Sequence, residues 1–224
     1  MQIDVFTLFP EWFDWFLGQR HVRNALRRGH ELRFFNYRDT TPLGAGQVDD
    51  TPYGGGAGMV IRVDVVDAAL QAVYGPDTDA MLASRRVAVL TPAGRQLDDE
   101  LASELAGFER LTLLCGRYEG IDERVIEHLA NHAISIGPYV LSGGELAAMV
   151  VADTVLRKLP GALGHEDSAL EESFSEALQG GPEYPHYTRP ASYRGWEVPE
   201  VLLSGHHADV ERWRREAAQN RRET

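Results

Sequence analysis

Two glycine-rich segments, separated by the length of one helix, are the part of the sequence best suited to chemistry. They are residues 111–120, LTLLCGRYEG, and residues 133–145, AISIGPYVLSGGE. Each begins with a short apolar run that predicts a buried strand. Because glycine tolerates positive φ and lets a backbone approach a ligand closely, the pattern predicts two loops that hold one small molecule. The alternative is that these glycines serve structural turns alone.

Neither loop carries a common nucleotide-binding signature. The dinucleotide fingerprint G-x-G-x-x-G is missing from both, and so is the phosphate-binding pattern G-x-x-x-x-G-K-[ST]. A nicotinamide-dependent enzyme is therefore disfavoured, although it remains an alternative that cofactor binding would test.

The sequence around these loops predicts an α/β fold. Apolar strands alternate along the chain with helical segments, which is typical of a mostly parallel sheet with helices on both faces. Residues 38–58, rich in Asp, Thr, Pro and Gly, predict a long loop of the kind that tends to be functional. We expect strands at 3–8, 31–36, 87–90, 111–115 and 133–136, and helices at 10–28, 64–74, 98–106, 121–130 and 145–159.

The pattern changes after residue 160. Pro160 and Gly161 end the preceding helix, and residues 161–181 are acidic and poor in large apolar side chains, which predicts a flexible linker. From residue 182 the sequence predicts a small helical appendage with an arginine-rich final helix. We therefore divide the chain into a domain at 1–160, a linker at 161–181 and a C-terminal helical domain at 182–224.

The composition limits the class of protein. With 224 residues, of which 43% are hydrophobic, the chain can bury a full core. The N-terminus has no basic region before an apolar run, and the most apolar helix is short and carries Asp153 and Arg157. We therefore expect neither a signal peptide nor a membrane span, and a cytoplasmic protein. The single cysteine, Cys115, is interpreted as a buried small side chain rather than a nucleophile.

The charge distribution is compatible with RNA but does not require it. The net charge of −12 argues against a generally basic surface for nucleic acid. However, all basic residues except Lys158 are arginines, and they concentrate in residues 20–38 and 212–222. Arginine can bind phosphate with two donors or stack on a base. Solvated helix faces are the alternative explanation for both clusters.

Six segments in order carry a resemblance to a known family. They are 52–59 (PYGGGAGM), 115–124 (CGRYEGIDER), 136–146 (IGPYVLSGGEL), 159–164 (LPGALG), 185–190 (PHYTRP) and 201–207 (VLLSGHH). Over nearly the whole chain they resemble the bacterial tRNA (guanine-N1)-methyltransferase family. The resemblance implies a fold of the SPOUT superfamily, whose cofactor site is a trefoil knot in the chain. It also implies methyl transfer from S-adenosylmethionine to N1 of the guanosine at tRNA position 37, immediately 3′ of the anticodon.

The resemblance assigns the cofactor to three segments, 89–95, 116–120 and 135–144. Backbone amides in these segments would bind the adenine edge, and Glu119 would face the ribose or the cationic end of the methyl donor. Pro138 stands where the family often has Asp, and a proline side chain cannot make the polar contact of that Asp. The residues assigned to the cofactor are Leu90, Thr91, Pro92, Gly94, Gly116, Tyr118, Glu119, Gly120, Ser135, Ile136, Gly137, Tyr139, Leu141, Gly143 and Gly144.

Methylation of guanine at N1 needs a base that removes the ring proton and a cation that stabilises the charge left on O6. By resemblance the cation is Arg157, held by Asp153 one helical turn earlier; a surface salt bridge is the alternative. The family's base is an Asp, and here Glu172 occupies its place, which is the main departure from the family. Glu171 or Asp167 as the base, or a solvated acidic linker with no catalytic role, are the alternatives.

The resemblance also implies partners: tRNA, a second copy of the chain in a homodimer with the active site between subunits, and Mg²⁺ that assists methyl transfer. We expect no protein ligands to a metal and neither DNA nor a membrane as a partner. Thr51 and Ala57 differ from the family's usual Arg and Pro. A non-catalytic RNA-binding protein with the same fold is the main alternative. The residues assigned to the substrate are Asp50, Tyr53, Gly55, Gly56, His186, Arg189, Ser204, His207 and Arg214.

Overall fold

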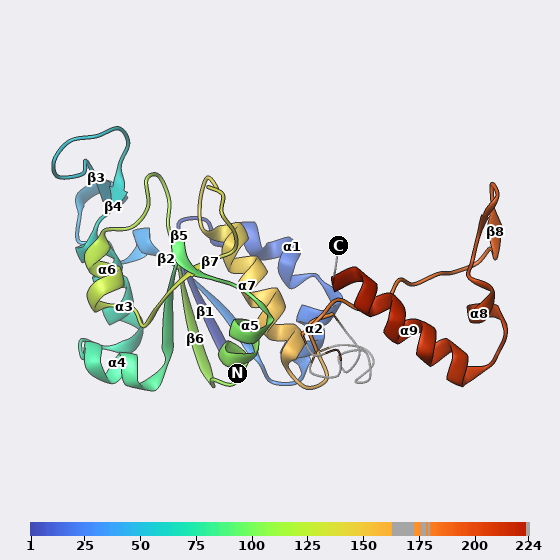
Figure 1. Cartoon of the computed structure of the whole chain (residues 1–224). Coiled ribbons are helices and arrows are strands. Elements are labelled where there is room, and N and C mark those ends of the chain that lie inside the picture. Colours follow the sequence, from blue (N-terminus) through green and yellow to red (C-terminus); the bar gives the residue numbers. More distant parts are fainter. Residues whose placement is uncertain (163–172, 176–177, 179, 223–224) are drawn as a thin grey trace. The chain divides into compact units, whose positions relative to one another are not determined.

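The computed structural model describes residues 1–162, 173–175, 178 and 180–222. The chain divides into two compact units, Met1–Gly164 and His165–Thr224, and each is described by itself (Figure 1). Among the described residues, no helix has the length and apolar character needed to cross a membrane.

The first unit is built on a five-stranded sheet in the order β2-β1-β6-β5-β7, in which every pairing is parallel. This confirms the predicted α/β fold with a parallel sheet. Parallel strands place their carboxyl ends at one edge, so the loops that follow β5, β6 and β7 meet there. The strands are β1 (Gln2–Thr7), β2 (Glu31–Asn36), β5 (Arg86–Gln96), β6 (Arg110–Cys115) and β7 (His132–Ser135).

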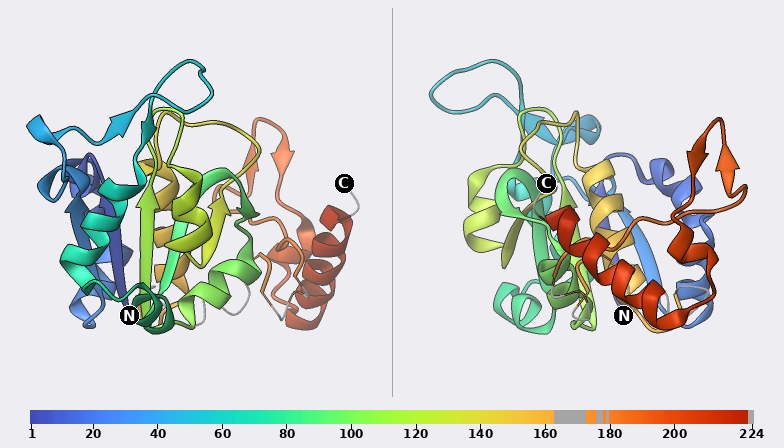
Figure 2. Two further views of the ribbon diagram at one scale, coloured as in Figure 1. Left: turned by 90° about the vertical axis from the view of Figure 1, so that its left-hand side faces the viewer. Right: turned by 45° about the vertical axis from the view of Figure 1, so that its right-hand side comes forward.

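Helices cover both faces of this sheet, as predicted (Figure 2). Alternate residues of each strand feed two separate apolar cores. For example, Leu113 of β6 packs with the helices of one face and Leu114 with those of the other. One face carries α1 (Asp14–Leu17), α2 (Arg20–Arg27), α5 (Asp99–Ala106) and α7 (Glu145–Lys158), and the other carries α3 (Val63–Tyr74), α4 (Thr78–Ser84) and α6 (Glu123–His128).

Three predicted helices differ from the structure. The segment 10–28 is not one helix, because Gln19 takes an extended backbone (ψ 143°) between α1 and α2, and residues 10–13 form a 3-10 turn. The predicted helix at 121–130 shortens to α6, which Asp122 caps by accepting a hydrogen bond from the Arg124 N–H. Helix α3 begins at Val63, one residue before the predicted start at Asp64, and the Asp64 carboxylate in its first turn binds the Arg62 guanidinium at 2.7 Å.

Strand β5 is longer than predicted and makes an excursion at its end. Leu90 and Arg95 both pair with Ile134 of β7, so residues 91–94 bulge out of the ladder between them. Gly94 permits this because a Cβ there would overlap the backbone of Ala133 and Ile134. The excursion therefore carries residues 91–92 to the carboxyl edge of the sheet.

The long loop at 38–58 contains short regular pieces. Residues 37–39 and 44–46 form 3-10 turns, and β3 (Asp49–Asp50) pairs antiparallel with β4 (Val60–Ile61). Between these two strands, four glycines adopt positive φ, a backbone conformation that other residues rarely take. These glycines are Gly54, Gly55, Gly56 and Gly58.

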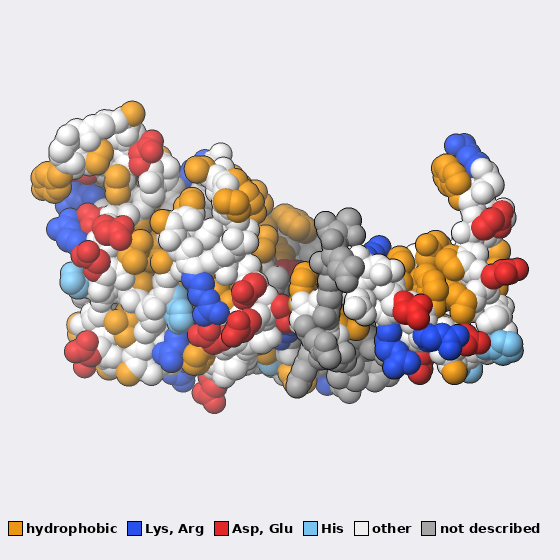
Figure 3. Space-filling view, in the orientation of Figure 1, with side chains coloured by type: hydrophobic (Ala, Val, Ile, Leu, Met, Phe, Trp, Pro, Cys, Tyr) orange, Lys and Arg blue, Asp and Glu red, His pale blue; other side chains and the backbone are white. Residues whose placement is uncertain are grey.

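The described part of the second unit contains a hairpin and two helices. The hairpin turns through Arg194 and Gly195, both with positive φ, and its Tyr193 and Trp196 side chains are exposed. In Figure 3 its tip carries hydrophobic and basic side chains. The elements are β8 (Ser192–Tyr193), β9 (Trp196–Glu197), α8 (Glu200–Leu203) and α9 (His207–Arg222).

At the amino edge of the sheet, a buried carboxylate joins three segments of the first unit. Asp4 is fully buried and accepts hydrogen bonds from Arg33 at 2.8 and 2.9 Å, from Arg85 at 3.0 Å and from the Tyr74 hydroxyl at 2.7 Å. Burial alone would raise the pKa of Asp4, but the hydrogen bonds, led by those from Arg33, outweigh burial and lower the pKa below its usual value.

We predict that Asp4→Asn destabilises the protein by about 3–5 kcal/mol at pH 7, because Arg85 would stay buried without its carboxylate. Urea unfolding measures this free energy. Since the folded-state pKa is the lower one, the stabilisation is complete above the unfolded value of about 3.9 and is lost as the pH falls below it. The difference between wild type and variant should therefore shrink in acid. Glu104→Gln, which breaks the exposed pair with Arg95, is the control and should cost about 0–1 kcal/mol.

Candidate active site

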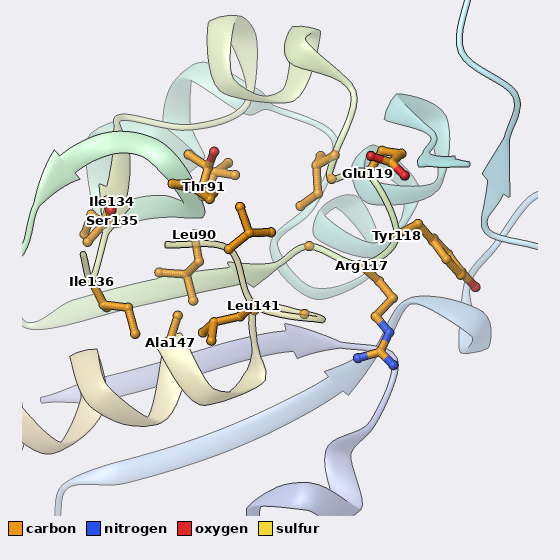
Figure 4. Close-up of a pocket in the computed structure, with 18 of the residues that line it drawn as sticks. Leu90, Thr91, Arg117, Tyr118, Glu119, Ile134, Ser135, Ile136, Leu141 and Ala147 are labelled. Atoms are coloured by element: carbon orange, nitrogen blue, oxygen red, sulfur yellow. The ribbon is translucent and has the colours of Figure 1, made fainter. Parts of the chain in front are cut away.

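A cavity of about 380 Å³ opens at the carboxyl edge of the sheet (Figure 4). Its walls come from the end of β5, from the loop that follows β6 and from the loop that follows β7, and helices α6 and α7 contribute single turns. A concave, mostly apolar site where parallel strands end is the usual place for a ligand in an α/β fold.

The structure brings together fourteen of the fifteen residues that the sequence assigned to a cofactor. The exception is Gly94, which packs against the backbone of β7 and does not line the cavity. The fourteen are Leu90, Thr91, Pro92, Gly116, Tyr118, Glu119, Gly120, Ser135, Ile136, Gly137, Tyr139, Leu141, Gly143 and Gly144.

Eight further residues line the cavity. Three of them, Val89, Arg117 and Val140, lie inside the segments that the sequence assigned to the cofactor but were not among the named residues. The other five were missed, and most of these are apolar residues that the sequence assigned only to buried strands or helices, so their pattern signalled burial and not a site. The eight are Val89, Arg117, Ile121, Glu123, Ile126, Ile134, Val140 and Ala147.

The loop after β6 is a tight turn that contacts the long glycine-rich loop. Tyr118 has positive φ, and the Gly120 N–H donates to the Arg117 carbonyl at 3.0 Å. The Glu119 N–H donates to the Met59 carbonyl, also at 3.0 Å. A Cβ on Gly58 would overlap the Glu119 side chain, so the end of the long loop packs directly against this carboxylate.

The loop after β7 is held by its own side chains and by Gly116. The Tyr139 hydroxyl donates to the Ile136 carbonyl at 3.0 Å, and its ring occupies the space that a Cβ on Gly137 would take. The Gly144 N–H donates to the Gly116 carbonyl at 2.8 Å, and a Cβ on Gly144 would lie 2.7 Å from Cys115 Cα. The two glycine-rich loops therefore touch through their backbones.

The substrate residues assigned in the long loop lie outside the cavity lining. Tyr53 is 99% exposed, and the Asp50 carboxylate lies 3.4 Å from the Arg62 guanidinium. Gly55 and Gly56 have positive φ near the tip of the loop. The hydrogen bond between Met59 and Glu119 ties the base of this loop to the cavity.

Of the predicted catalytic pair, only Arg157 lies within the described residues. Glu172 lies outside them, as do the alternatives Glu171 and Asp167. Arg157 is in the last turn of α7, ten residues beyond Ala147, which corresponds to about 15 Å along the helix axis. The Asp153 carboxylate, predicted to hold Arg157, lies 2.5 Å from Nε2 of His21.

The substrate residues assigned in the second unit are placed on its surface or in short local contacts. Arg189 and His207 are exposed, and His186 Nε2 lies 3.2 Å from the Glu183 carboxylate. The Ser204 hydroxyl donates to the Val201 carbonyl at 2.8 Å at the end of α8. The Arg214 guanidinium lies 4.6 Å from the centre of the Tyr184 ring.

Two further observations concern Cys115 and possible metal ligands. Cys115 is buried, which confirms its interpretation as a small core side chain, and burial raises the pKa of its thiol well above the usual value. Within the described part of the chain, no group of three or more His, Cys, Asp or Glu side chains could hold a metal ion.

Comparisons of the sequence with known proteins show the family of the chain. The chain matches the tRNA (guanine-1)-methyltransferase TrmD family over residues 1–224. It is 51% identical over 217 residues to the tRNA (guanine-N(1)-)-methyltransferase of Brevibacillus brevis, covering 96% of this chain and 85% of that protein. The enzymes of the same name from Dehalococcoides mccartyi and Geobacter sulfurreducens are both 48% identical, covering 99% and 97% of this chain and 87% and 86% of theirs. The chain belongs to the TrmD family of tRNA (guanine-N1)-methyltransferases.

Proposed function

We propose that this chain transfers a methyl group from S-adenosylmethionine to N1 of the guanosine at position 37 of tRNA, immediately 3′ of the anticodon. Membership of the TrmD family over the whole chain supports the reaction. The observation that carries the proposal for the cofactor is the convergence of residues 90–92, 116–120 and 135–144 on one cavity.

The residues of this cavity fit the proposed cofactor. Its volume of about 380 Å³ lies within the ~300–1,000 Å³ that is usual for small-ligand sites. Leu90, Ile136 and Leu141 offer apolar surface to a purine ring, and the glycine-rich backbone offers amides to its edge. Glu119 supplies a carboxylate for ribose hydroxyls or for a cationic centre. When bound, S-adenosylmethionine supplies an electrophilic methyl group.

The proposed roles at the guanine follow from the charges that the reaction creates. The Glu172 carboxylate takes the N1 proton, which gives the ring nitrogen its nucleophilic electron pair. The Arg157 guanidinium stabilises the negative charge that develops on O6. Both roles rest on the resemblance to the family, and the longer side chain of Glu172 keeps the acid-base chemistry of the family's Asp.

A homodimer with shared active sites is supported by the position of Arg157. Its place about 15 Å from the cavity-lining end of α7 is too far for service to the same chain's cavity. Leu146 and Val150 of α7 are exposed apolar side chains. Val150 follows Leu146 by four residues and Arg157 follows it by eleven, so all three lie on one face of the helix. If a second copy of the chain covers this face, Arg157 of the first chain comes close to the cavity of the second. Trp12 and Trp15, in the neighbouring turns before α2, are exposed too.

The path that the chain takes after β7 supports our proposal of a trefoil knot. In the sheet, β5 lies between β6 and β7. The segment that leaves β7 must therefore pass the end of β5 before Gly143 pairs with Arg117 and α7 begins. The end of β5 in turn pairs back onto β7. Crossings of this kind are consistent with the trefoil of the SPOUT superfamily.

We place the tRNA contacts on both units. The loop that carries Asp50, Tyr53, Gly55 and Gly56 would surround the target guanine, which is supported by its hydrogen bond to Glu119. The exposed basic side chains of the second unit would bind the tRNA backbone. The same proposal includes a cytoplasmic location and a division of the chain at 1–160, 161–181 and 182–224, with the linker as a lid over the site. The residues proposed in the second unit are His186, Arg189, Ser204, His207 and Arg214.

The proposal includes assistance of methyl transfer by Mg²⁺, as the resemblance implies. Since the described residues offer no cluster of metal ligands, we assign Mg²⁺ no protein site and route no step through it.

The proposed function is tested by methyl transfer to an unmodified tRNA transcript. We expect the purified protein to form N1-methylguanosine at position 37 and to leave a transcript with adenosine at that position unmodified. Calorimetry should show binding of S-adenosylmethionine and not of NAD. Tight tRNA binding without any methyl transfer would instead support the non-catalytic alternative.

Shared active sites are tested by mixing inactive subunits. We predict that Arg157→Ala and Glu172→Ala dimers are each inactive, and that mixed dimers regain some activity if each site takes one of these residues from each chain. Radiolabelled methyl transfer measures the recovery, and mixtures of either variant with itself are the controls. No recovery in a confirmed mixed dimer would mean that both residues come from one chain.

The base is tested by removing its charge while its shape is kept. We predict that Glu172→Gln slows single-turnover methyl transfer by at least ~10²-fold, as expected for loss of a general base, with little change in cofactor affinity. Glu172→Asp should stay active because it restores the family's residue. Glu171→Gln is the matched control. If that control loses activity and Glu172→Gln does not, the base is Glu171.

A further inference from the structure

Glu145, the first residue of α7, is a buried carboxylate that the proposed reaction does not use. Its side chain is only 1% exposed. Oε1 accepts a hydrogen bond of 2.8 Å from the Thr7 hydroxyl at the end of β1, but Oε2 has no hydrogen-bond partner among the described residues. A buried carboxylate is costly unless opposite charge compensates it, so its place beside the cavity needs an explanation.

The cation that faces this carboxylate is Arg117. It lines the cavity in the loop after β6, and its Nη1 atom is buried without a hydrogen-bond partner in the described structure. Its guanidinium lies 5.0 and 5.7 Å from the ring centres of Phe9 and Trp12, where cation-π attraction holds it. In Figure 4 the Arg117 side chain extends away from Glu119, which belongs to the same loop.

Gly143 separates the two charged groups. A Cβ placed on Gly143 would lie within 3 Å of both Glu145 Oε2 and Arg117 Nη1. The backbone of Gly143 also forms a β-bridge with Arg117, so the loop after β7 is held between the carboxylate and the guanidinium. The opposite charges attract each other across this gap even without a direct salt bridge.

The other polar neighbours of Glu145 carry no charge that could compensate its carboxylate. Burial raises the pKa of Tyr37 and of Cys115 well above their usual values, and the charge of Glu145 adds to both shifts. Tyr37 and Cys115 therefore stay neutral at ordinary pH and offer no charge to Glu145. Thr7 is a neutral donor, so Arg117 is left to compensate the carboxylate.

We propose that Glu145 and Arg117 are positioning residues that set the spacing between the two glycine-rich walls of the cavity, acting across Gly143. Arg117 belongs to the wall at 116–120, whereas Glu145 anchors the end of the wall at 137–144 to β1 through Thr7. Their attraction draws the two walls together. The inference rests on the proposed function, because the ligand between the walls is taken to be S-adenosylmethionine.

The test compares Glu145→Gln, Arg117→Gln and the double variant with a control of equal burial. Asp4→Asn removes a carboxylate that is also fully buried but lies at the opposite edge of the sheet. Calorimetry gives the Kd for S-adenosylmethionine, melting gives stability, and steady-state kinetics separates KM from kcat. A purely structural role would lower the melting temperature of Glu145→Gln and Asp4→Asn alike and leave their cofactor Kd unchanged.

We expect Glu145→Gln and Arg117→Gln each to raise the Kd and the KM for S-adenosylmethionine by ~10-fold, with kcat nearly unchanged, as for lost uniform binding. The double variant should be little worse than either single variant, because interacting residues are not additive. Asp4→Asn should melt earlier yet keep its Kd within about two-fold, since its site is distant from the cavity. Additive losses, or equal losses of affinity in Asp4→Asn, would overturn the proposal.

Gly143→Ala provides a second route if Glu145→Gln fails to fold. The added methyl group would push the carboxylate and the guanidinium apart, and it should weaken cofactor binding as Arg117→Gln does. If Gly143→Ala and Arg117→Gln both bind S-adenosylmethionine with unchanged affinity, the inference is overturned but the proposed function is not. Wild-type protein that does not bind S-adenosylmethionine would overturn the proposed function together with the inference.

Discussion

Direct backbone contact between the two glycine-rich loops is the constraint on which the rest of the site depends. The Gly144 N–H reaches the Gly116 carbonyl at 2.8 Å, and any Cβ on Gly144 would collide with the backbone at Cys115 and Gly116. The chain after β7 can therefore lie directly on the chain after β6. This contact fixes where α7 begins, and with it the positions of Ala147 in the cavity wall and of the buried Glu145 carboxylate.

A second close approach brings the third segment to the same place. Parallel strands end at one edge, where Leu90 of β5 is level with Cys115 at the end of β6, and the apolar pattern predicted that β5 stops there. Gly94 lets the strand cross the backbone of β7 instead, and the excursion at residues 91–94 supplies the cavity with Thr91 and Pro92. Gly94 was assigned to the cofactor from sequence, yet its role is to shape the path of its neighbours.

The parts of the fold that the sequence predicted are those set by local signals. Apolar alternation predicted the strands, and glycines at strand ends predicted the cavity loops. The helix at 10–28 was wrong because its apolar pattern continues through Gly18, while the extended backbone of Gln19 breaks the helix. Arg117 and Glu145 escaped prediction for another reason. These two residues lie near each other only because β1, the loop after β6 and the loop after β7 come together in the fold. No residue spacing along the sequence predicts that these three segments lie side by side.

The length of helix α7 bears on how many chains form one active site. Its first turn lines the cavity at Ala147 and its last turn carries Arg157, so a rigid helix holds the two apart by about 15 Å. This separation is the reason for our proposal that Arg157 serves the cavity of a second copy of the chain. The exposed Leu146 and Val150 lie on the same helical face as Arg157 and provide the apolar surface that such a copy would cover.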